Sequence, residues 1–307
     1  MKKIYVHPML SESEKEYFIS KVSSEFDVIF NDGNNSFETA KDATIVVGNF
    51  DTSWIAEMAN LEVILLDSVG TDNLNGYEWK ADNKVTVHNL NDFFSGPVAE
   101  EAVANIMSIY RQIPALNVAK AESKWIKDEI RFEKRLIAEA KTLLVGNGNI
   151  GQQIHKLLNG FGSEVSIFDR TEMEANGKAG LKEAVAKADI IVSTLPANEE
   201  TNGIFDLEVF DAMPAGATFL NLGRGPVVNE NDLAEKAKSD SSFNACLDVT
   251  IQEPLPVESS LWPLSNVWLT QHTGGGSPTE NIKKIDIYLE QLDRIITKQP
   301  LNNKVNF

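Results

Sequence analysis

The stretch LLVGNGNIGQQIHKLLNGFG, residues 143–162, joins an apolar run, a glycine-rich turn and an amphipathic helix pattern. Its glycines follow the spacing Gly146-x-Gly148-x-x-Gly151 directly after the apolar run. In this context the first glycine permits a tight turn, the second lets the backbone approach a pyrophosphate, and the third allows close packing of helix and strand. The amino terminus of the helix then offers unpaired N–H groups to phosphates. The stretch therefore predicts a strand–turn–helix unit that binds a dinucleotide.

The next predicted strand, residues 164–168, ends at Asp169. A carboxylate roughly 20 residues beyond the glycines accepts hydrogen bonds from the ribose hydroxyls of NAD and repels the 2′-phosphate of NADP. We therefore expect NAD as the cofactor. The neighbouring Arg170 leaves NADP open as the less favoured alternative, because a guanidinium can pair with a phosphate.

The chain has 307 residues, which exceeds the usual size of a single hydrophobic core and favours two domains. Short apolar runs alternate with amphipathic stretches, which predicts parallel sheets covered by helices on both faces. Six such runs between residues 142 and 270 match the strand number of a dinucleotide-binding sheet. A long helix is expected from Pro97 onward, and the closing helix, 279–296, is expected to return to the first domain. The predicted domains are residues 1–92 with 277–307, and residues 93–276.

Composition excludes several classes of partner. The net charge of −17 opposes binding to nucleic acid or anionic membranes, because both need a basic surface. The absence of a signal-peptide pattern or a long apolar segment leads us to expect a cytoplasmic protein. The single cysteine, Cys246, lies in an apolar run and is expected in the core, and no cluster of residues suggests a metal site. His7, His88 and His155 are expected to have structural or surface roles.

Three ionisable residues lie just past the ends of three predicted strands. Arg224 follows the run 218–222, Glu253 follows the run 243–249, and His272 follows the run 267–270. In an open α/β sheet, ligands bind outside the carboxyl ends of the strands. These three side chains are therefore the first candidates for a catalytic site.

Around these residues the sequence resembles the D-isomer-specific 2-hydroxyacid dehydrogenases. The resemblance implies a Rossmann-type nucleotide-binding domain inserted in a discontinuous, flavodoxin-like substrate domain. It also implies hydride transfer between NAD(H) and a small D-2-hydroxy acid or the corresponding 2-oxo acid, and a homodimer with the helix 98–111 near its interface. The matching motifs, in the family's order, are SVGTDN (68–73), VAE (98–100), VGNGNIG (145–151), NLGRGPVV (221–228), LDVTIQEPLP (247–256), LTQH (269–272) and PLNNKVNF (300–307).

The same resemblance implies a role for each candidate residue. Arg224 would pair with the substrate carboxylate and polarise the 2-oxo group, and His272 would exchange a proton with the substrate oxygen. Glu253 would hold the imidazole in one orientation. The substrate carboxylate would also bind backbone N–H groups in the segment Ser68, Val69, Gly70. The implied cofactor contacts are Gly146, Gly148, Asn149, Ile150, Gly151, Asp169, Arg170, Pro196, Thr201 and Asp248.

Departures from the family pattern surround the catalytic positions without removing a catalytic group. Thr250 replaces the usual aromatic residue, Gln271 the common proline, and Thr273 a frequent aliphatic residue. An apolar substrate pocket is suggested by three aromatic residues in candidate pocket segments, Phe93, Phe94 and Trp262.

The alternative function, which is not enzymatic, is that of an NADH-sensing binding protein without turnover. Certain transcriptional corepressors look similar and retain the same three residues. Within the enzymes, formate is disfavoured as a substrate because Glu253 stands in place of glutamine, whereas phosphite stays open.

Overall fold

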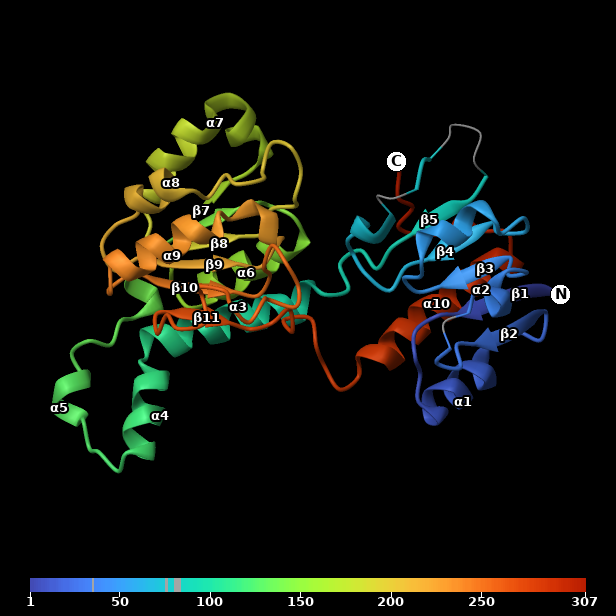
Figure 1. Cartoon of the computed structure of the whole chain (residues 1–307), viewed down its shortest axis with the longest axis horizontal. Coiled ribbons are helices and arrows are strands. Elements are labelled where there is room, and N and C mark those ends of the chain that lie inside the picture. The colour runs from blue at the N-terminus through green and yellow to red at the C-terminus, as the bar shows by residue number, and fades with distance from the viewer. Residues whose placement is uncertain (35, 75–76, 80–83) are drawn as a thin grey trace. The chain divides into compact units, whose positions relative to one another are not determined.

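The computed structural model describes residues 1–34, 36–74, 77–79 and 84–307 (Figure 1). The chain forms two compact units, one of Met1–Phe94 with Ser277–Phe307 and the other of Ser95–Gly276. The domain boundaries predicted from the sequence lie between residues 92 and 93 and between residues 276 and 277.

The first unit is built on a parallel sheet with the strand order β2-β1-β3-β4-β5 within its described residues. This order is flavodoxin-like, as expected. Side chains alternate between two apolar clusters: Ile4 and Val6 face the helices α1 and α10, whereas Tyr5 packs with Trp54 on the other face. The elements are β1 (Lys2–Val6), α1 (Glu12–Lys21), β2 (Phe26–Phe30), α2 (Phe37–Ala40), β3 (Ile45–Val47), β4 (Val63–Leu65), β5 (Thr86–His88) and α10 (Glu280–Ile296).

The second unit, described over its full length, holds a six-stranded parallel sheet in the order β11-β10-β9-β8-β6-β7. The strand number agrees with the sequence analysis. The elements are α3 (Ser95–Tyr110), α4 (Ile113–Ala121), α5 (Lys127–Ile130), β6 (Lys141–Val145), α6 (Asn149–Gly160), β7 (Glu164–Phe168), α7 (Arg170–Val185), β8 (Ile190–Ser193), α8 (Leu207–Ala212), β9 (Thr218–Asn221), α9 (Glu230–Ser239), β10 (Asn244–Leu247) and β11 (Val267–Leu269).

The edge of this second sheet departs from the usual dinucleotide-binding order, in which a further strand lies outside the second one. Over residues 95–276, β7 is itself the edge strand. The chain passes from β7 directly into α7, which is interrupted at Gly177 with a φ of 57° and a ψ of −157°. The direction of the chain changes at this glycine, and the next strand is β8 on the far side of β6.

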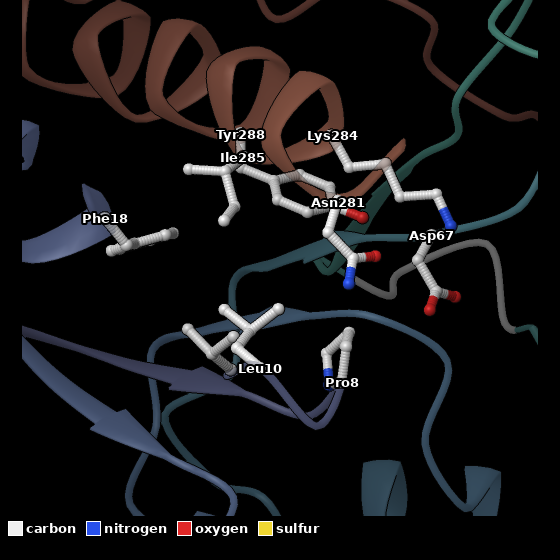
Figure 2. Close-up of a pocket in the computed structure, with 9 residues that line it drawn as sticks. Pro8, Leu10, Phe18, Asp67, Asn281, Lys284, Ile285 and Tyr288 are labelled. Atoms are coloured by element: carbon white, nitrogen blue, oxygen red, sulfur yellow. The ribbon is translucent and has the colours of Figure 1, made fainter. Parts of the chain in front are cut away.

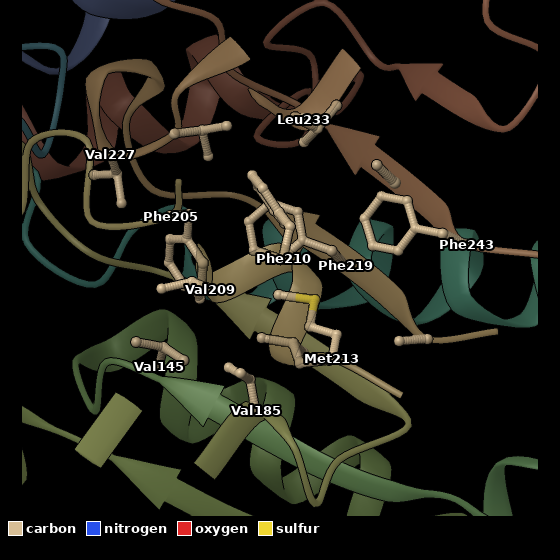
Figure 3. Packing of buried hydrophobic residues seen from close by; sticks show 14 of the residues in the cluster. Val145, Val185, Phe205, Val209, Phe210, Met213, Phe219, Val227, Leu233 and Phe243 are labelled. Carbon is tan, nitrogen blue, oxygen red and sulfur yellow. The ribbon is translucent and has the colours of Figure 1, made fainter. Parts of the chain in front are cut away.

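Phenylalanine rings pack together in the core on one face of this sheet (Figure 3). The ring centroids of Phe205 and Phe219 lie 4.8 Å apart, and Phe210 packs edge-on against both Phe219 and Phe243.

Cys246 is buried on β10, the strand that pairs with β9, and burial raises the pKa of its thiol to about 12. The expectation that this cysteine is a core residue is confirmed.

Two short helices complete the description of the chain. Thr52–Ala56 forms a 3₁₀ helix, and α5 lies in the otherwise irregular, largely polar stretch after α4. Within the described part of the chain, no helix is long and apolar enough to cross a membrane. The same residues contain no group of histidine, cysteine and acidic side chains suited to a metal ion.

Candidate active site

The glycine-rich turn follows β6 and leads into α6. Gly146 has a φ of 109°, and a Cβ added there would lie 2.6 Å from the hydroxyl oxygen of Thr194. A Cβ on Gly151 would lie 2.6 Å from the carbonyl oxygen of Gly146. By contrast, a Cβ on Gly148 would meet no atom within 4 Å. The first and third glycines are thus required by the protein's own packing, whereas the second faces open space.

The turn presents hydrogen-bond donors at that open side. Gly148 is the N-cap of α6, and no side chain caps this helix end. The first N–H groups of a helix, here including that of Ile150, have no partner inside the helix. Together with the helix dipole they form a site suited to a pyrophosphate. The residues present therefore fit a dinucleotide.

Asp169 ends β7 and begins α7. Its Oδ1 accepts the backbone N–H groups of Thr171 and Glu172 at 3.0 and 3.3 Å, so the carboxylate caps this helix. The guanidinium of Arg170 is largely exposed and donates to Glu174 at 2.7 Å, one helical turn away. Arg170 is therefore held along α7 by an acidic neighbour, which the sequence analysis did not anticipate.

The loop after β8 contains two further predicted cofactor contacts. The hydroxyl of Thr201 donates to the carbonyl oxygen of Pro196 at 2.6 Å and lies 3.0 Å from Oδ1 of Asn198. Thr201 is buried. Its side chain therefore holds the loop 196–201 in a fixed shape.

His272 and Glu253 meet beyond the ends of β11 and β10. Nδ1 of His272 lies 2.6 Å from Oε2 of Glu253. The other carboxylate oxygen, Oε1, accepts the backbone N–H of Thr250 at 3.0 Å. Both side chains are partly exposed, with 54% of the histidine side chain and 38% of the glutamate side chain accessible. The imidazole is thus oriented by a carboxylate and remains open to a ligand.

Asp248 fixes the backbone that carries His272. Its Oδ1 accepts from the hydroxyl of Thr270 and from the N–H groups of Thr273 and Gly274, at 2.7, 3.1 and 3.3 Å. Its carbonyl oxygen accepts the N–H of His272 at 2.6 Å. Both Gln271 and His272 have a φ near 57°, a region that non-glycine residues rarely occupy. Asp248 compensates for this unusual turn by binding the residues on both sides of it.

Arg224 lies between two glycines at the end of β9. A Cβ on Gly223 would lie 2.2 Å from the carbonyl oxygen of Leu195, and one on Gly225 would lie 2.0 Å from the carbonyl carbon of Thr250. The backbone around Arg224 is therefore pressed against the loops that follow β8 and β10. Because Thr250 also binds Glu253, Arg224 is connected to the histidine–glutamate pair through consecutive contacts.

The segment Ser68–Gly70 belongs to the first unit and follows β4. Its turn is held by the Ser68 hydroxyl, which donates to the carbonyl oxygen of Gly70 at 2.7 Å, and by Asn89, whose amide donates to Val69 at 2.7 Å. The N–H groups of Val69 and Gly70 make no hydrogen bond with any described residue. They are therefore available to an anion.

Several functional neighbours were not identified from the sequence. Gly223, Gly225 and Thr250 position Arg224 and Glu253, and the glycines that flank an arginine in NLGRGPVV are the one signal that could have indicated this. Trp262, expected near the pocket, is partly exposed and donates its Nε1–H to Pro256 at 2.9 Å.

Two phenylalanines and three further histidines were also singled out from the sequence. Phe93 and Phe94 pack against the apolar cluster of the first unit. His88 is buried and binds the carbonyl oxygen of Asn302 at 2.7 Å. His7 packs against aromatic rings. His155 is a partly exposed residue of α6.

Comparison with known proteins identifies the family. Residues 103–274 match the family model described as D-isomer specific 2-hydroxyacid dehydrogenase, NAD binding domain. The chain is 27% identical over 292 residues to glyoxylate/hydroxypyruvate reductase A of Arabidopsis thaliana, covering 92% of this chain and 90% of the relative. It is 30% identical over 236 residues to hydroxypyruvate reductase of Thermotoga maritima, covering 75% and 76% of the two chains.

Solved structures agree with the fold. A D-isomer specific 2-hydroxyacid dehydrogenase family protein from Aeromonas salmonicida superimposes with a TM-score of 0.85 at 23% identity, over 99% of both chains. Similar folds are known with either cofactor. A probable 2-hydroxyacid dehydrogenase from Rhizobium etli holds NADP (TM-score 0.78, 21% identity, covering 100% of this chain and 98% of the other). D-lactate dehydrogenase from Lactobacillus jensenii holds NAD⁺ (TM-score 0.78, 21% identity, covering 99% and 100%). The chain therefore belongs to the D-isomer specific 2-hydroxyacid dehydrogenase family, an oxidoreductase family with an NAD-binding domain.

Proposed function

We propose that this protein uses NADH to reduce a small 2-oxo acid to the D-2-hydroxy acid, and catalyses the reverse reaction with NAD⁺. The observation that carries the proposal is the pair of His272 and Glu253, at 2.6 Å, connected to Arg224 through the contacts of Thr250. The groups needed for proton exchange and for carboxylate binding thus lie on neighbouring strand ends of the sheet that bears the glycine-rich turn.

Each residue has a defined task in this proposal. Arg224 binds the substrate carboxylate and draws electron density from the 2-oxo group, because a guanidinium is permanently charged and donates two parallel hydrogen bonds. NADH, when bound, supplies the hydride. His272 gives a proton to the substrate oxygen from Nε2, since Nδ1 is held by Glu253. In the reverse direction the same nitrogen accepts the proton.

The first unit serves as the substrate domain in this proposal. The N–H groups of Val69 and Gly70 donate hydrogen bonds to the substrate carboxylate, because a turn that presents successive N–H groups attracts anions. Local donors of this kind are needed because the protein carries a net charge of −17 and repels an anionic substrate at long range.

NAD is proposed over NADP because of the groups at the end of β7. The carboxylate of Asp169 is fixed as a helix cap and would repel a 2′-phosphate. Arg170, the cation that could oppose this repulsion, is paired with Glu174 at 2.7 Å. Selection between the cofactors is therefore expected to depend on Asp169.

A homodimer is proposed from the apolar surface of the second unit. Large hydrophobic side chains are exposed along α3, α4 and the segment that follows, and several exposed apolar side chains in one region of a domain favour an association site. They are Met107, Ile113, Val118, Trp125, Phe132 and Leu136. Sedimentation analysis of the wild-type protein is expected to show a dimer. The double variant with Trp125→Ser and Phe132→Ser should sediment as a monomer.

The activity is tested with purified protein, NADH or NADPH, and a panel of glyoxylate, hydroxypyruvate, pyruvate, and branched and aromatic 2-oxo acids. We expect oxidation of NADH with at least one acid and production of the D-hydroxy acid on chiral analysis. Tight NADH binding without turnover of any acid would contradict the proposed activity and favour a cofactor-sensing role.

A further inference from the structure

A small cavity lies inside the first unit, between the carboxyl ends of its central strands and the helix α10 (Figure 2). Its volume is about 30 Å³. Apolar side chains, among them Leu10 and Phe18, line one side. Asp67, Lys284 and the hydroxyl of Tyr288 lie on the other. The cavity therefore has a polar end that faces the start of the segment Ser68–Gly70.

Tyr288 brings a buried hydroxyl to this polar end. Only 4% of the residue is exposed, and its phenolic oxygen has no hydrogen-bond partner among the described residues. Burial raises the pKa of Tyr288 well above its usual value, so the phenol stays protonated and can donate. A buried hydroxyl without a partner is costly, and native structures generally satisfy such groups with protein atoms or with ordered water.

Asp67 supplies the acceptor. Its carboxylate lines the same cavity, acts electrostatically on Tyr288, and makes no hydrogen bond or ion pair with another described residue. The nearby cation, Lys284, is engaged elsewhere: its ammonium binds Glu280 at 2.6 Å and lies 5.1 Å from the ring centroid of Phe94. Asp67 also acts electrostatically on His7, but His7 does not line this cavity. In the cavity lining, the phenol of Tyr288 is the buried hydroxyl that can hold the Asp67 carboxylate toward α10.

The size of the cavity indicates what joins these groups. A volume of about 30 Å³ accommodates one or two water molecules, which need several polar partners. The phenol, the carboxylate and the amide of Asn281 provide such partners. A water molecule that bridges two polar groups stabilises the structure nearly as well as a direct hydrogen bond between those groups.

We propose that Tyr288 is a positioning residue which, through water held in this cavity, keeps the charge of Asp67 turned away from the anion-binding turn of residues 68–70. The inference rests on the proposed function, in which the N–H groups of that turn bind the substrate carboxylate. Asp67 directly precedes Ser68, and a carboxylate free to swing toward Val69 and Gly70 repels an anionic substrate. Holding it on α10 removes this repulsion.

The kinetic test uses Tyr288→Phe, which deletes only the hydroxyl. We expect the KM for the 2-oxo acid to rise about fivefold, the scale of one lost hydrogen bond, with kcat changed less than about twofold and NADH affinity unchanged. In an Asp67→Asn background the same substitution should have little effect, because the repelling charge is gone. Additive effects of the two substitutions would overturn the inference, since a purely structural role of the phenol does not depend on the charge of residue 67.

Tyr110→Phe is the matched control. Tyr110 is also a buried tyrosine whose hydroxyl has no hydrogen-bond partner among the described residues, but it lies on α3 in the second unit. Loss of the Tyr110 hydroxyl should leave the KM for the 2-oxo acid unchanged. An equal KM increase in this control would show a general effect of losing a buried hydroxyl and would also overturn the inference.

A second readout does not require activity. Amide hydrogen exchange of the segment 66–71 should be faster in Tyr288→Phe than in the wild type and in Tyr110→Phe. If the wild type reduces no 2-oxo acid, the proposed function fails while this measurement still decides whether Tyr288 restrains the turn. Identical exchange in all three proteins refutes that restraint.

Discussion

Glu253 binds His272 with one carboxylate oxygen and the backbone of its own loop with the other, at 2.6 and 3.0 Å. The glutamate therefore cannot rotate away from the imidazole without losing its second hydrogen bond. The pair therefore predicts different effects for substitution of the histidine and of the glutamate.

His272→Gln should lower kcat by about 10²–10⁴-fold, because the group that exchanges the proton is lost, while NADH binding is retained. Glu253→Gln keeps a hydrogen-bonding side chain but removes the charge, so its effect on kcat should be smaller. Steady-state kinetics and NADH fluorescence titration measure both quantities. Full activity of His272→Gln would remove this residue from the mechanism.

Gly148→Ala separates cofactor binding from folding. Its Cβ meets no protein atom within 4 Å, so the melting temperature should stay close to that of the wild type. The methyl group instead occupies the open side of the turn, and we expect the Kd for NADH to rise by about tenfold or more. Gly160→Ala, whose Cβ also meets nothing within 4 Å, is the control and should bind NADH normally. Normal affinity of Gly148→Ala would place the cofactor elsewhere.

Gly225→Ala, in contrast to Gly148→Ala, should lower the stability of the protein. A Cβ there would lie 2.0 Å from the carbonyl carbon of Thr250, and neither backbone can move without displacing Arg224 or Glu253. We expect a loss of stability of about 1–3 kcal/mol, the cost of overpacking, together with a large loss of kcat/KM. Urea unfolding and kinetics test this together. A stable, fully active variant is incompatible with the contact.

Asp169→Ser should shift cofactor preference toward NADPH by at least about tenfold in the ratio of kcat/KM values, because the charge that repels the 2′-phosphate is removed. Serine can still cap α7, so stability should change little. Asp169→Ala, which loses the cap as well, should be less stable by about 1 kcal/mol. Unchanged preference in both variants would show that Asp169 does not select the cofactor.

Stability should fall in mild acid because of His88. Burial lowers its pKa in the folded protein below the ordinary 6.5, so the unfolded chain binds a proton at a pH where the folded chain does not. The free energy of unfolding is therefore retained above pH 6.5 and decreases as the pH falls below it.

Urea unfolding of the wild type at about pH 7.5 and about pH 5.5 measures this decrease. His88→Asn should show a smaller difference between the two values, although the lowered pKa of His7 maintains part of it. His155→Asn serves as the control. An equal pH dependence in His88→Asn and the wild type contradicts the assignment.

The sequence predicted the parallel sheets because β-branched and apolar runs recur between amphipathic stretches, a pattern that depends on local residues only. The strand ends were less well defined: the apolar run 63–67 forms a strand only to Leu65, and Asp67 lies past its end, in the lining of the cavity beside α10. Residues 170–185 form α7 with a break at Gly177 in place of a further strand.

The candidate site was predictable wherever a residue carries its own chemistry, as Arg224, Glu253 and His272 do. What their surroundings contribute could not be read from the sequence. The contact between Gly225 and Thr250 joins positions 25 residues apart, and the hydrogen bonds of Asp248 to residues 270–274 bridge a similar distance. Such pairings follow from how neighbouring strands are aligned, which no single segment specifies.

The three links from Asp248 to residues 270–274 have a consequence for any attempt to transplant this chemistry. Grafting the histidine loop alone onto another scaffold would carry the imidazole but not the clamp that forces two successive residues into a left-handed bend. The shortest segment that carries the histidine–glutamate pair together with these hydrogen bonds therefore runs from Asp248 to Gly274.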